Sequence, residues 1–396
     1  MLAPLSTSPT GPGAILTLVR SGQAVTRAGL MEITGLSRST IGQRLDQLLA
    51  AGYLIAGPVE SSTGGRPAGG LVINPQFGLL LLVAAGASGF TAAIADFCGN
   101  VIEQRSVTMD IARGPAAVLG RMQTIFRDLL NQIGHKPAGV KGIGIGLPGP
   151  VAFPEGQLVR PPIMTGWDGY RVPDFFAGQF DAPVLVDNDA NLMALGEQQQ
   201  SFPQVKDLLY LKLGTGIGVG LIMDGQLQRG AQGAAGNIGH WFMPPAGDTS
   251  GSSAAAGPRL CRCGNQGCLE AYSSGWALCE ECGVTRVRDL TRRAADGDMA
   301  MLARLRAAGQ HQGEALALAV NLTNPAVVVV GGSLAQDQLL AALRETVYRR
   351  SGSLATRSLQ IVAGPLGNDA GLHGAAHLVS DALLAPHVVD RHLSAG

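Results

Sequence analysis

Residues 208–227 read LLYLKLGTGIGVGLIMDGQL. One apolar run enters the glycine turn GTGIG, a second leaves it, and Asp224-Gly225 makes another tight turn, so the stretch predicts a β-hairpin followed by a second turn. Residues 79–107, LLLLVAAGASGFTAAIADFCGNVIEQRSV, have the same design. Two such hairpins, each opening a sheet, predict a duplicated α/β body with two lobes.

The remaining body alternates apolar runs with helical patterns. Short runs rich in Val, Ile and Leu beside glycine predict buried strands, and apolar residues at helical spacing predict helices. Strands are expected within 140–151, 182–199, 325–334 and 359–364, and helices at about 115–133, late in 182–199, at 287–295, 299–306 and 310–323, and on both sides of the last strand.

The glycines of GTGIG have two interpretations. They allow backbone N–H groups to approach a phosphate closely. A purely structural glycine turn would have the same sequence, so this motif alone leaves phosphate binding open.

Residues 1–77 predict a small helical module. A first helix follows Gly13, a second fits 27–34, and Gly35-Leu36 makes a turn. Ser37 can cap a third helix, SRSTIGQRLDQLLAAG, which Gly52 ends. Its apolar stripe consists of Ile41, Leu45, Leu48 and Leu49. Helix, glycine turn and helix form the helix-turn-helix pattern.

A predicted hairpin follows these helices. YLIAGPVE and LVIN are its strands, and SSTGGRPAGG is its tip. A helix-turn-helix with such a wing places its third helix in the major groove of DNA. The alternative is a small protein-interaction module. The candidate DNA-binding residues are Arg38, Ser39, Thr40, Gln43, Arg44 and, on the wing, Arg66.

The loop from His240 to Glu270 is dense in Gly and Pro and ends in CRCGNQGCLE. His240, Cys261, Cys263 and Cys268 form a Cys3His set, which suits a closed, tetrahedral zinc site. The alternative is a group of ordinary buried thiols.

Three further cysteines lie outside this set. Cys279 and Cys282 form a second CxxC, interpreted as plain thiols on a helix, with a redox pair or alternative metal ligands as the other possibilities. Cys98 is expected to be a packed thiol.

Composition places the chain in a broad class. It has 396 residues, of which 46% are hydrophobic and 15% charged, with zero net charge, so charge favours no particular partner. Its first residues lack the pattern of a signal peptide, and its apolar runs are too short to span a bilayer. Six cysteines in this arrangement indicate the reducing cytoplasm and metal ligation rather than disulfides.

Taken together, GIGIGLPGPV, VDNDAN, LKLGTGIGVGLIMDGQLQRGAQGAAGNIGH and CRCGNQGCLE resemble the ROK family (repressor, open reading frame, kinase) of sugar kinases and sugar-responsive repressors. The winged module with STGGRP is similar to the DNA-binding part of the repressor branch. The resemblance implies an α/β actin-like, hexokinase-like (ribonuclease H-like) fold. It divides the chain into a winged helix-turn-helix domain at 1–77, a first lobe at 78–190 joined by a C-terminal helix at about 370–396, and a second lobe with the zinc loop at 191–369.

The resemblance also assigns site residues. Zinc, in a structural role, would be held by the Cys3His set. Asp189 occupies the position of the base that deprotonates the sugar hydroxyl in family kinases. From the sequence alone, Asp189 also fits a helix cap, and Glu270 also fits a solvated surface charge. The implied sugar-binding residues are Asn188, Asp189, Asn237, His240 and Glu270.

Three positions depart from the family pattern. Family kinases open their first hairpin with Asp-X-Gly-Gly-Thr, which handles phosphate and magnesium, whereas this chain has Ala84 at the Asp position. Asn237 stands where many members have Glu, and Ile163 lies near a frequent Asn. Loss of the carboxylate at position 84 predicts that the chain is not an active kinase.

The prediction is therefore a transcriptional regulator, a repressor, that binds operator DNA as a homodimer or tetramer. Its body would sense a sugar or sugar phosphate, and it would have no membrane partner. The alternatives are an ATP-dependent, glucokinase-like sugar kinase and a regulator controlled by a protein partner instead of a sugar.

Overall fold

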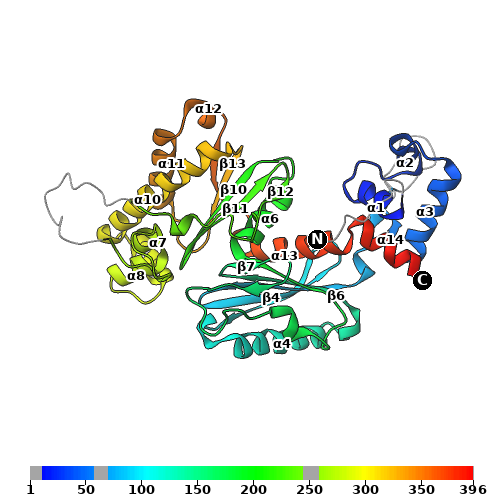
Figure 1. The fold of residues 1–396 in the computed structure, drawn as a ribbon, viewed down its shortest axis with the longest axis horizontal. Helices are drawn as coiled ribbons and strands as arrows, with labels where there is room; N and C mark the ends of the chain where they lie inside the picture. Colours follow the sequence, from blue (N-terminus) through cyan, green and yellow to red (C-terminus); the bar gives the residue numbers. More distant parts are fainter. Residues whose placement is uncertain (1–10, 58–69, 244–257, 396) are drawn as a thin grey trace.

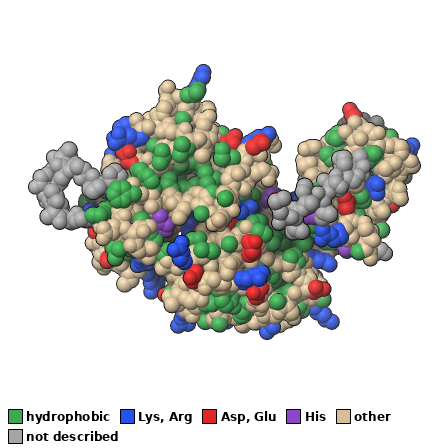
Figure 2. Space-filling view, in the orientation of Figure 1, with side chains coloured by type: hydrophobic (Ala, Val, Ile, Leu, Met, Phe, Trp, Pro, Cys, Tyr) green, Lys and Arg blue, Asp and Glu red, His purple; other side chains and the backbone are tan. Residues whose placement is uncertain are grey.

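The computed structural model describes residues 11–57, 70–243 and 258–395. It has a mixed α/β architecture, as the sequence predicts, with a small helical module beside two larger lobes (Figure 1). Figure 2 shows the module as a separate knob at the right of the molecule. Within the described ranges, no helix is long and apolar enough to cross a membrane.

The N-terminal module has helices where the sequence predicts them. Thr26 and Ser37 cap the second and third helices by accepting hydrogen bonds from the backbone N–H groups of Gly29 and Thr40. Gly35, at φ +66°, ends the second helix in the left-handed conformation. The helices are α1 (Pro12–Arg20), α2 (Arg27–Thr34) and α3 (Arg38–Ala50).

A two-stranded antiparallel hairpin completes the module. Its strands are β1 (Leu54–Ala56) and β2 (Leu71–Ile73), with Leu54 opposite Ile73. The predicted wing tip, with Arg66, lies outside the described residues.

Each lobe contains a five-stranded sheet, and the two sheets have the same topology. Three antiparallel strands lie on one side, and the first of them pairs in parallel with the fourth strand. The sheet orders are β5-β4-β3-β6-β9 and β12-β11-β10-β13-β14. This repetition is the duplication predicted from the two glycine hairpins.

The strands of the first lobe are β3 (Leu79–Gly86), β4 (Gly89–Asp96), β5 (Val101–Thr108), β6 (Val140–Leu147) and β9 (Val184–Asn188), with a small hairpin of β7 (Val151–Ala152) and β8 (Gln157–Leu158). Those of the second lobe are β10 (Leu208–Leu213), β11 (Ile217–Met223), β12 (Gln226–Leu227), β13 (Val327–Gly331) and β14 (Gln360–Ala363).

Alternating residues of the strands enter different cores. In β3, Leu81 and Val83 pack toward α4 (Pro115–Gln132), whereas Leu80 and Leu82 belong to a core shared with α6 (Asp189–Ser201) and α13 (Ala370–Leu383). The inward face of β10 joins the same shared core. Helices α6 and α13 thus lie between the two sheets.

Glycines allow these two central helices to touch. A Cβ on Gly374 would lie 1.8 Å from the Leu192 carbonyl oxygen, and one on Gly196 would lie 2.0 Å from the Ala370 carbonyl oxygen. Only glycine fits such close approach of two backbones. Helix α6 also contacts the segment before α13, since the fully buried Glu197 accepts a hydrogen bond from the Leu366 N–H at 3.0 Å.

The second lobe differs from the prediction at one helix. The two helices predicted at 299–306 and 310–323 are one, α10 (Met299–Thr323). Gly309 lies inside it, where a Cβ would come within 2.3 Å of the Leu339 carbonyl oxygen of α11 (Asp337–Arg350). The glycine allows close helix packing instead of ending the helix. The remaining helices are α5 (Val172–Phe176), α7 (Glu270–Ser273), α8 (Gly275–Glu281), α9 (Val287–Ala295) and α12 (Ser353–Thr356).

The predicted single C-terminal helix is two helices. Helix α13 packs between the lobes, and α14 (Pro386–Ala395) packs on α1 of the N-terminal module (Figure 1). Asp390 Oδ1 accepts a hydrogen bond from the Gly13 N–H at 2.8 Å, and Tyr53 Oη lies 2.7 Å from His392 Nδ1. The C-terminus therefore connects the body to the module.

An ion-pair network strengthens this junction. Asp381 of α13 pairs with Arg20 of α1 and with His377 one turn earlier. Burial opposes ionisation of Asp381, but His377 and Arg20 together hold the pKa of this carboxyl below its usual value. The Asp381 carboxylate is therefore ionised at neutral pH and pairs with the Arg20 guanidinium.

Candidate functional site

Asp189 and Lys212 join the two lobes. Asp189 is the first residue of α6, directly after β9, and Lys212 lies near the end of β10. Their side chains form an ion pair, with 11% and 18% of the respective side chains exposed. The predicted base position therefore has a lysine as its direct partner, which sequence reasoning did not identify.

The alternative that Asp189 caps a helix is wrong. Asn188 is the cap: its Oδ1 accepts a hydrogen bond from the Ala190 N–H at 2.9 Å, and its Nδ2 donates to the Gly149 carbonyl at 3.0 Å. Asn188 thus fixes the start of α6, and the Asp189 carboxylate is left to meet Lys212.

A second buried ion pair lies beside the first. Asp187, 1% exposed, accepts hydrogen bonds from Arg229 Nε at 2.7 Å and from Asn191 Nδ2 at 2.8 Å. The Arg229 guanidinium also lies over the Phe153 ring, 3.9 Å from its centroid. The negative charge of Asp187 is therefore balanced by Arg229 within the protein.

Glu270 is not a solvated surface charge, because its Oε1 accepts a hydrogen bond from the Ile217 N–H at 2.6 Å. A Cβ on Gly216 would lie 2.6 Å from the same oxygen, so the glycine turn packs directly on this carboxylate. Asn237 is exposed three residues before His240, at the start of a single 3-10 turn.

The four predicted metal ligands come together. The ligand atoms of His240, Cys261, Cys263 and Cys268 all lie within 4.8 Å of one another. His240 Nδ1 is 3.7 Å from Cys261 Sγ, and Cys263 Sγ is 3.8 Å from Cys268 Sγ. A tetrahedron with Zn–S bonds of about 2.3 Å has S–S edges of about 3.8 Å. The donor set and spacing therefore fit zinc.

The thiols of this group need a metal to ionise. Burial, with the neighbouring thiols, raises the pKa of Cys261 to about 12. Burial also raises the pKa of Cys268. Only a bound cation would hold several thiolates this close together at neutral pH.

The other cysteines stay outside the group. Cys279 is buried in α8, and Cys282 follows that helix; both are free thiols. Cys98 is also free, but it is exposed, so its prediction as a packed thiol is wrong. It lies in the turn after β4, where the Asp96 carboxylate accepts hydrogen bonds from the local N–H groups, and not inside the sheet.

Two of the three positions that depart from the family pattern, Ala84 and Ile163, lie in packed surroundings. Ala84 is half-buried in β3, facing α13: its Cβ is 3.0 Å from where a Cβ on Gly371 would stand. Ile163 packs against the core between the first sheet and α4.

The candidate DNA-binding residues described by the structure share one helix. Arg38, Ser39 and Gln43 are exposed on α3, whereas Thr40 and Arg44 are half-buried. Ile41, Leu45 and Leu48 anchor the opposite face in the core. Helix α3 thus presents a polar face to solvent from a firmly packed element.

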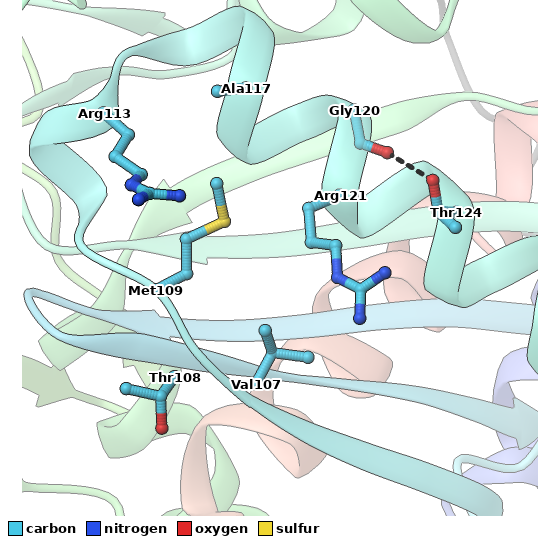
Figure 3. A pocket seen from close by; sticks show the side chains of 8 residues that line it. All are labelled: Val107, Thr108, Met109, Arg113, Ala117, Gly120, Arg121 and Thr124. Carbon is cyan, nitrogen blue, oxygen red and sulfur yellow. Dashed lines mark hydrogen bonds between the residues drawn. The ribbon is translucent and has the colours of Figure 1, made fainter.

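Two pockets lie away from the candidate sugar-, metal- and DNA-binding residues. One, of 460 Å³, lies over β5 and α4 and is lined by Arg113 and Arg121, with Met109 between them and β5 below (Figure 3). The other, of 220 Å³, lies between the N-terminal module and the body, beside Arg20 and His377.

Sequence reasoning missed Asp187, Lys212 and Arg229. A signal was present for the first two, because each is a charged residue within an otherwise apolar strand. A charge in such a place requires a partner. The identity of the partners depends on how the lobes meet, which local patterns do not contain.

Comparison with known proteins adds the wider context. The model of the ROK family matches residues 81–382. The chain is 27% identical to the xylose repressor of Caldicellulosiruptor bescii, over 94% of this chain and 96% of that protein. It is 26% identical to the glucokinase of Halalkalibacterium halodurans, over 75% of this chain and 93% of that protein. A ROK family transcriptional regulator, a homologue of the E. coli MLC protein, has the same fold, with a TM-score of 0.78, 23% identity and coverage of 97% and 98% of the two chains.

Proposed function

This chain belongs to the ROK family, and on that premise we propose that it is a sugar-responsive, DNA-binding transcriptional regulator, a repressor. The observation that carries the proposal is the N-terminal module, with the exposed polar face of α3. The similar repressor spans this module, whereas the similar glucokinase covers three quarters of the chain. Phosphorylation of a sugar does not require a helix-turn-helix module.

The site chemistry supports a sensor without phosphoryl transfer. Ala84 provides no carboxylate to help hold magnesium, and the Asp189 carboxylate is already paired with the Lys212 ammonium. Hydroxyls of a sugar would instead be bound by groups of fixed geometry. The proposed sugar-binding set is Asn188, Asp189, Asn237, His240 and Glu270.

Kinase activity gives a direct test of this part of the proposal. In a coupled ATP-consumption assay with several hexoses and pentoses, we expect turnover below about 0.01 s⁻¹, against about 10 s⁻¹ for a typical enzyme. Ala84→Asp alone should not restore turnover, because the Asp189 carboxylate would still be paired with the Lys212 ammonium. Turnover near 1 s⁻¹ in the unaltered protein would overturn the proposal.

We propose a structural role for zinc at the Cys3His group. The metal would hold the loop before Glu270 against His240, so that Glu270 stays fixed on the Ile217 N–H. Bound zinc would supply the ionisation of the thiols and the rigidity of the loop, and no reaction step.

We further propose that a sugar acts by favouring one arrangement of the lobes. Helices α6 and α13 lie between the lobes, and α13 leads to α14 on the DNA-binding module, so a change in lobe arrangement would move that module. In a homodimer or tetramer, this would alter the spacing of two modules relative to half-sites about one helical turn apart. The ligand shifts the balance only by its difference in affinity for the two states.

Arg38→Ala should weaken operator binding. The exposed guanidinium at the start of α3 is placed to meet phosphate, so we expect a loss of affinity of about 3- to 10-fold and a salt dependence shallower by about 0.9 in log–log slope. Fluorescence anisotropy with labelled operator DNA at several salt concentrations measures both. Arg357→Ala, an exposed arginine in the second lobe, is the matched control and should change neither. Equal effects of the two variants would contradict the assignment of α3.

A further inference from the structure

Lys212 carries an inference beyond the sugar-binding set given above. Its ammonium lies at the junction of the lobes, bonded to Asp189, and 18% of its side chain is exposed. An ammonium has three donors, and the described contacts of Lys212 use one of them, on Asp189. A ligand at this junction would therefore meet both a fixed donor and a fixed acceptor.

The charges around this pair are already matched within the protein. Asp187 is paired with Arg229, Asp189 is paired with Lys212, and Glu270 accepts a backbone N–H. In the described contacts, Arg229 and Lys212 each pair with one of these carboxylates, so neither cation is free to bind a further anion. A phosphate placed at Lys212 would also stand next to Asp189, so attraction and repulsion would largely cancel.

A sugar hydroxyl suits this pair better. It can donate its hydrogen to Asp189 while accepting one from Lys212, so both charged groups keep a partner and no new charge is buried. A site of this kind rejects a ligand that lacks the hydroxyl, because the polar groups of the site would then be unpaired.

We propose that Lys212 is an effector-binding residue that, with Asp189, selects an uncharged sugar over its phosphate ester. This rests on the proposed function, and it narrows the effector from a sugar or sugar phosphate to the uncharged sugar.

The first experiment needs no variant. The melting temperature and dissociation constants of the full-length protein are measured with D-xylose, D-glucose, N-acetyl-D-glucosamine and the phosphate esters of these sugars. We expect at least one free sugar to bind, with its phosphate ester at least 10-fold weaker. Tighter binding of an ester would overturn the selectivity and leave the sensor proposal intact. If neither class bound or released operator DNA, the sensor proposal itself would fail.

Two variants then test the pair, because they should shift the preference between free sugar and phosphate ester in opposite directions. Lys212→Met leaves the Asp189 charge unpaired, so the free sugar should bind at least 10-fold weaker and the ester weaker still. Asp189→Asn leaves the ammonium unpaired, so the preference should shift toward the ester. A purely structural role would lower both affinities by the same factor in both variants, and that result would overturn the proposal.

Lys206→Met is the matched control. Lys206 also forms an ion pair with an aspartate, Asp224, but both side chains are largely exposed and stand at the opposite end of β10. Its removal should leave the affinities for both classes unchanged. Equal losses in the Lys206 and Lys212 variants would exclude Lys212 from the site.

Discussion

Cys263→Ser abolishes the response to sugar while operator binding stays within about twofold of the unaltered protein; this is the expected result with the largest functional effect. Within the described residues, the local core around the Cys3His group has three buried members, Cys261, Cys268 and Ala271, with Cys263, Tyr272 and Trp276 partly buried against them, so it is a small core to hold the loop without a metal. Structural zinc contributes about 10–16 kcal/mol of apparent binding free energy in zinc-finger peptides.

The effect should reach the site through Glu270. This residue follows Cys268 by two positions and bonds the Ile217 N–H next to the glycine turn. Loss of the metal releases the loop and thereby the position of Glu270. The N-terminal module, which packs at the opposite end of the body, should keep its fold (Figure 1).

Two measurements and one control variant separate these outcomes. Elemental analysis should give about one zinc per chain before the substitution and far less after it. Anisotropy with operator DNA should give a nearly unchanged affinity but no release by sugar. Cys279→Ser is the matched control, since Cys279 is a buried thiol outside the group, and it should keep both zinc and response. A normal sugar response in the Cys263 variant would contradict a structural role of the metal.

Gly374→Ala should have the largest effect on stability. The added methyl carbon would stand 1.8 Å from the Leu192 carbonyl oxygen, and no rotamer change relieves a clash with backbone. Helices α6 and α13 would have to separate, and with them the core that both lobes share. Overpacking costs typically 1–3 kcal/mol and more where the neighbour cannot move, so we expect a loss of at least 3 kcal/mol or failure to fold.

The matched control is the same substitution in another helix. Gly120 lies in α4 with no atom within 4 Å of an added Cβ. Gly120→Ala should stabilise the protein by about 0.5–1 kcal/mol, because alanine has the higher helix propensity. Urea unfolding of both variants measures the difference. If Gly374→Ala were as stable as Gly120→Ala, the close crossing of α6 and α13 would be wrong.

The sequence predicted those parts that local patterns determine. The two glycine hairpins and the apolar runs predicted the strands, and the Cys3His pattern predicted four ligand atoms that lie within 4.8 Å of one another. Local sequence patterns failed where contacts between distant segments determine the structure. Gly309 is a helix breaker in isolation but a packing contact against α11, so one helix was predicted as two.

The candidate site shows the same division. The local sequence VDNDAN marked Asp189, but the capping role belongs to Asn188, one residue earlier. Lys212 had no predicted role, because its partner comes from the other lobe. Which charges meet across two lobes depends on the packing of α6 and α13, and no short stretch of sequence states it.

The seating of α14 on α1 has a consequence for the order of folding. Gly13 and Tyr53 find their partners 377 and 339 residues later in the chain. Contacts of such long sequence separation are slow to form, because the two segments must first be brought together by the folding of the lobes between them. A chain cut before α14 lacks both contacts, so its N-terminal module is expected to be less stable than in the full-length protein.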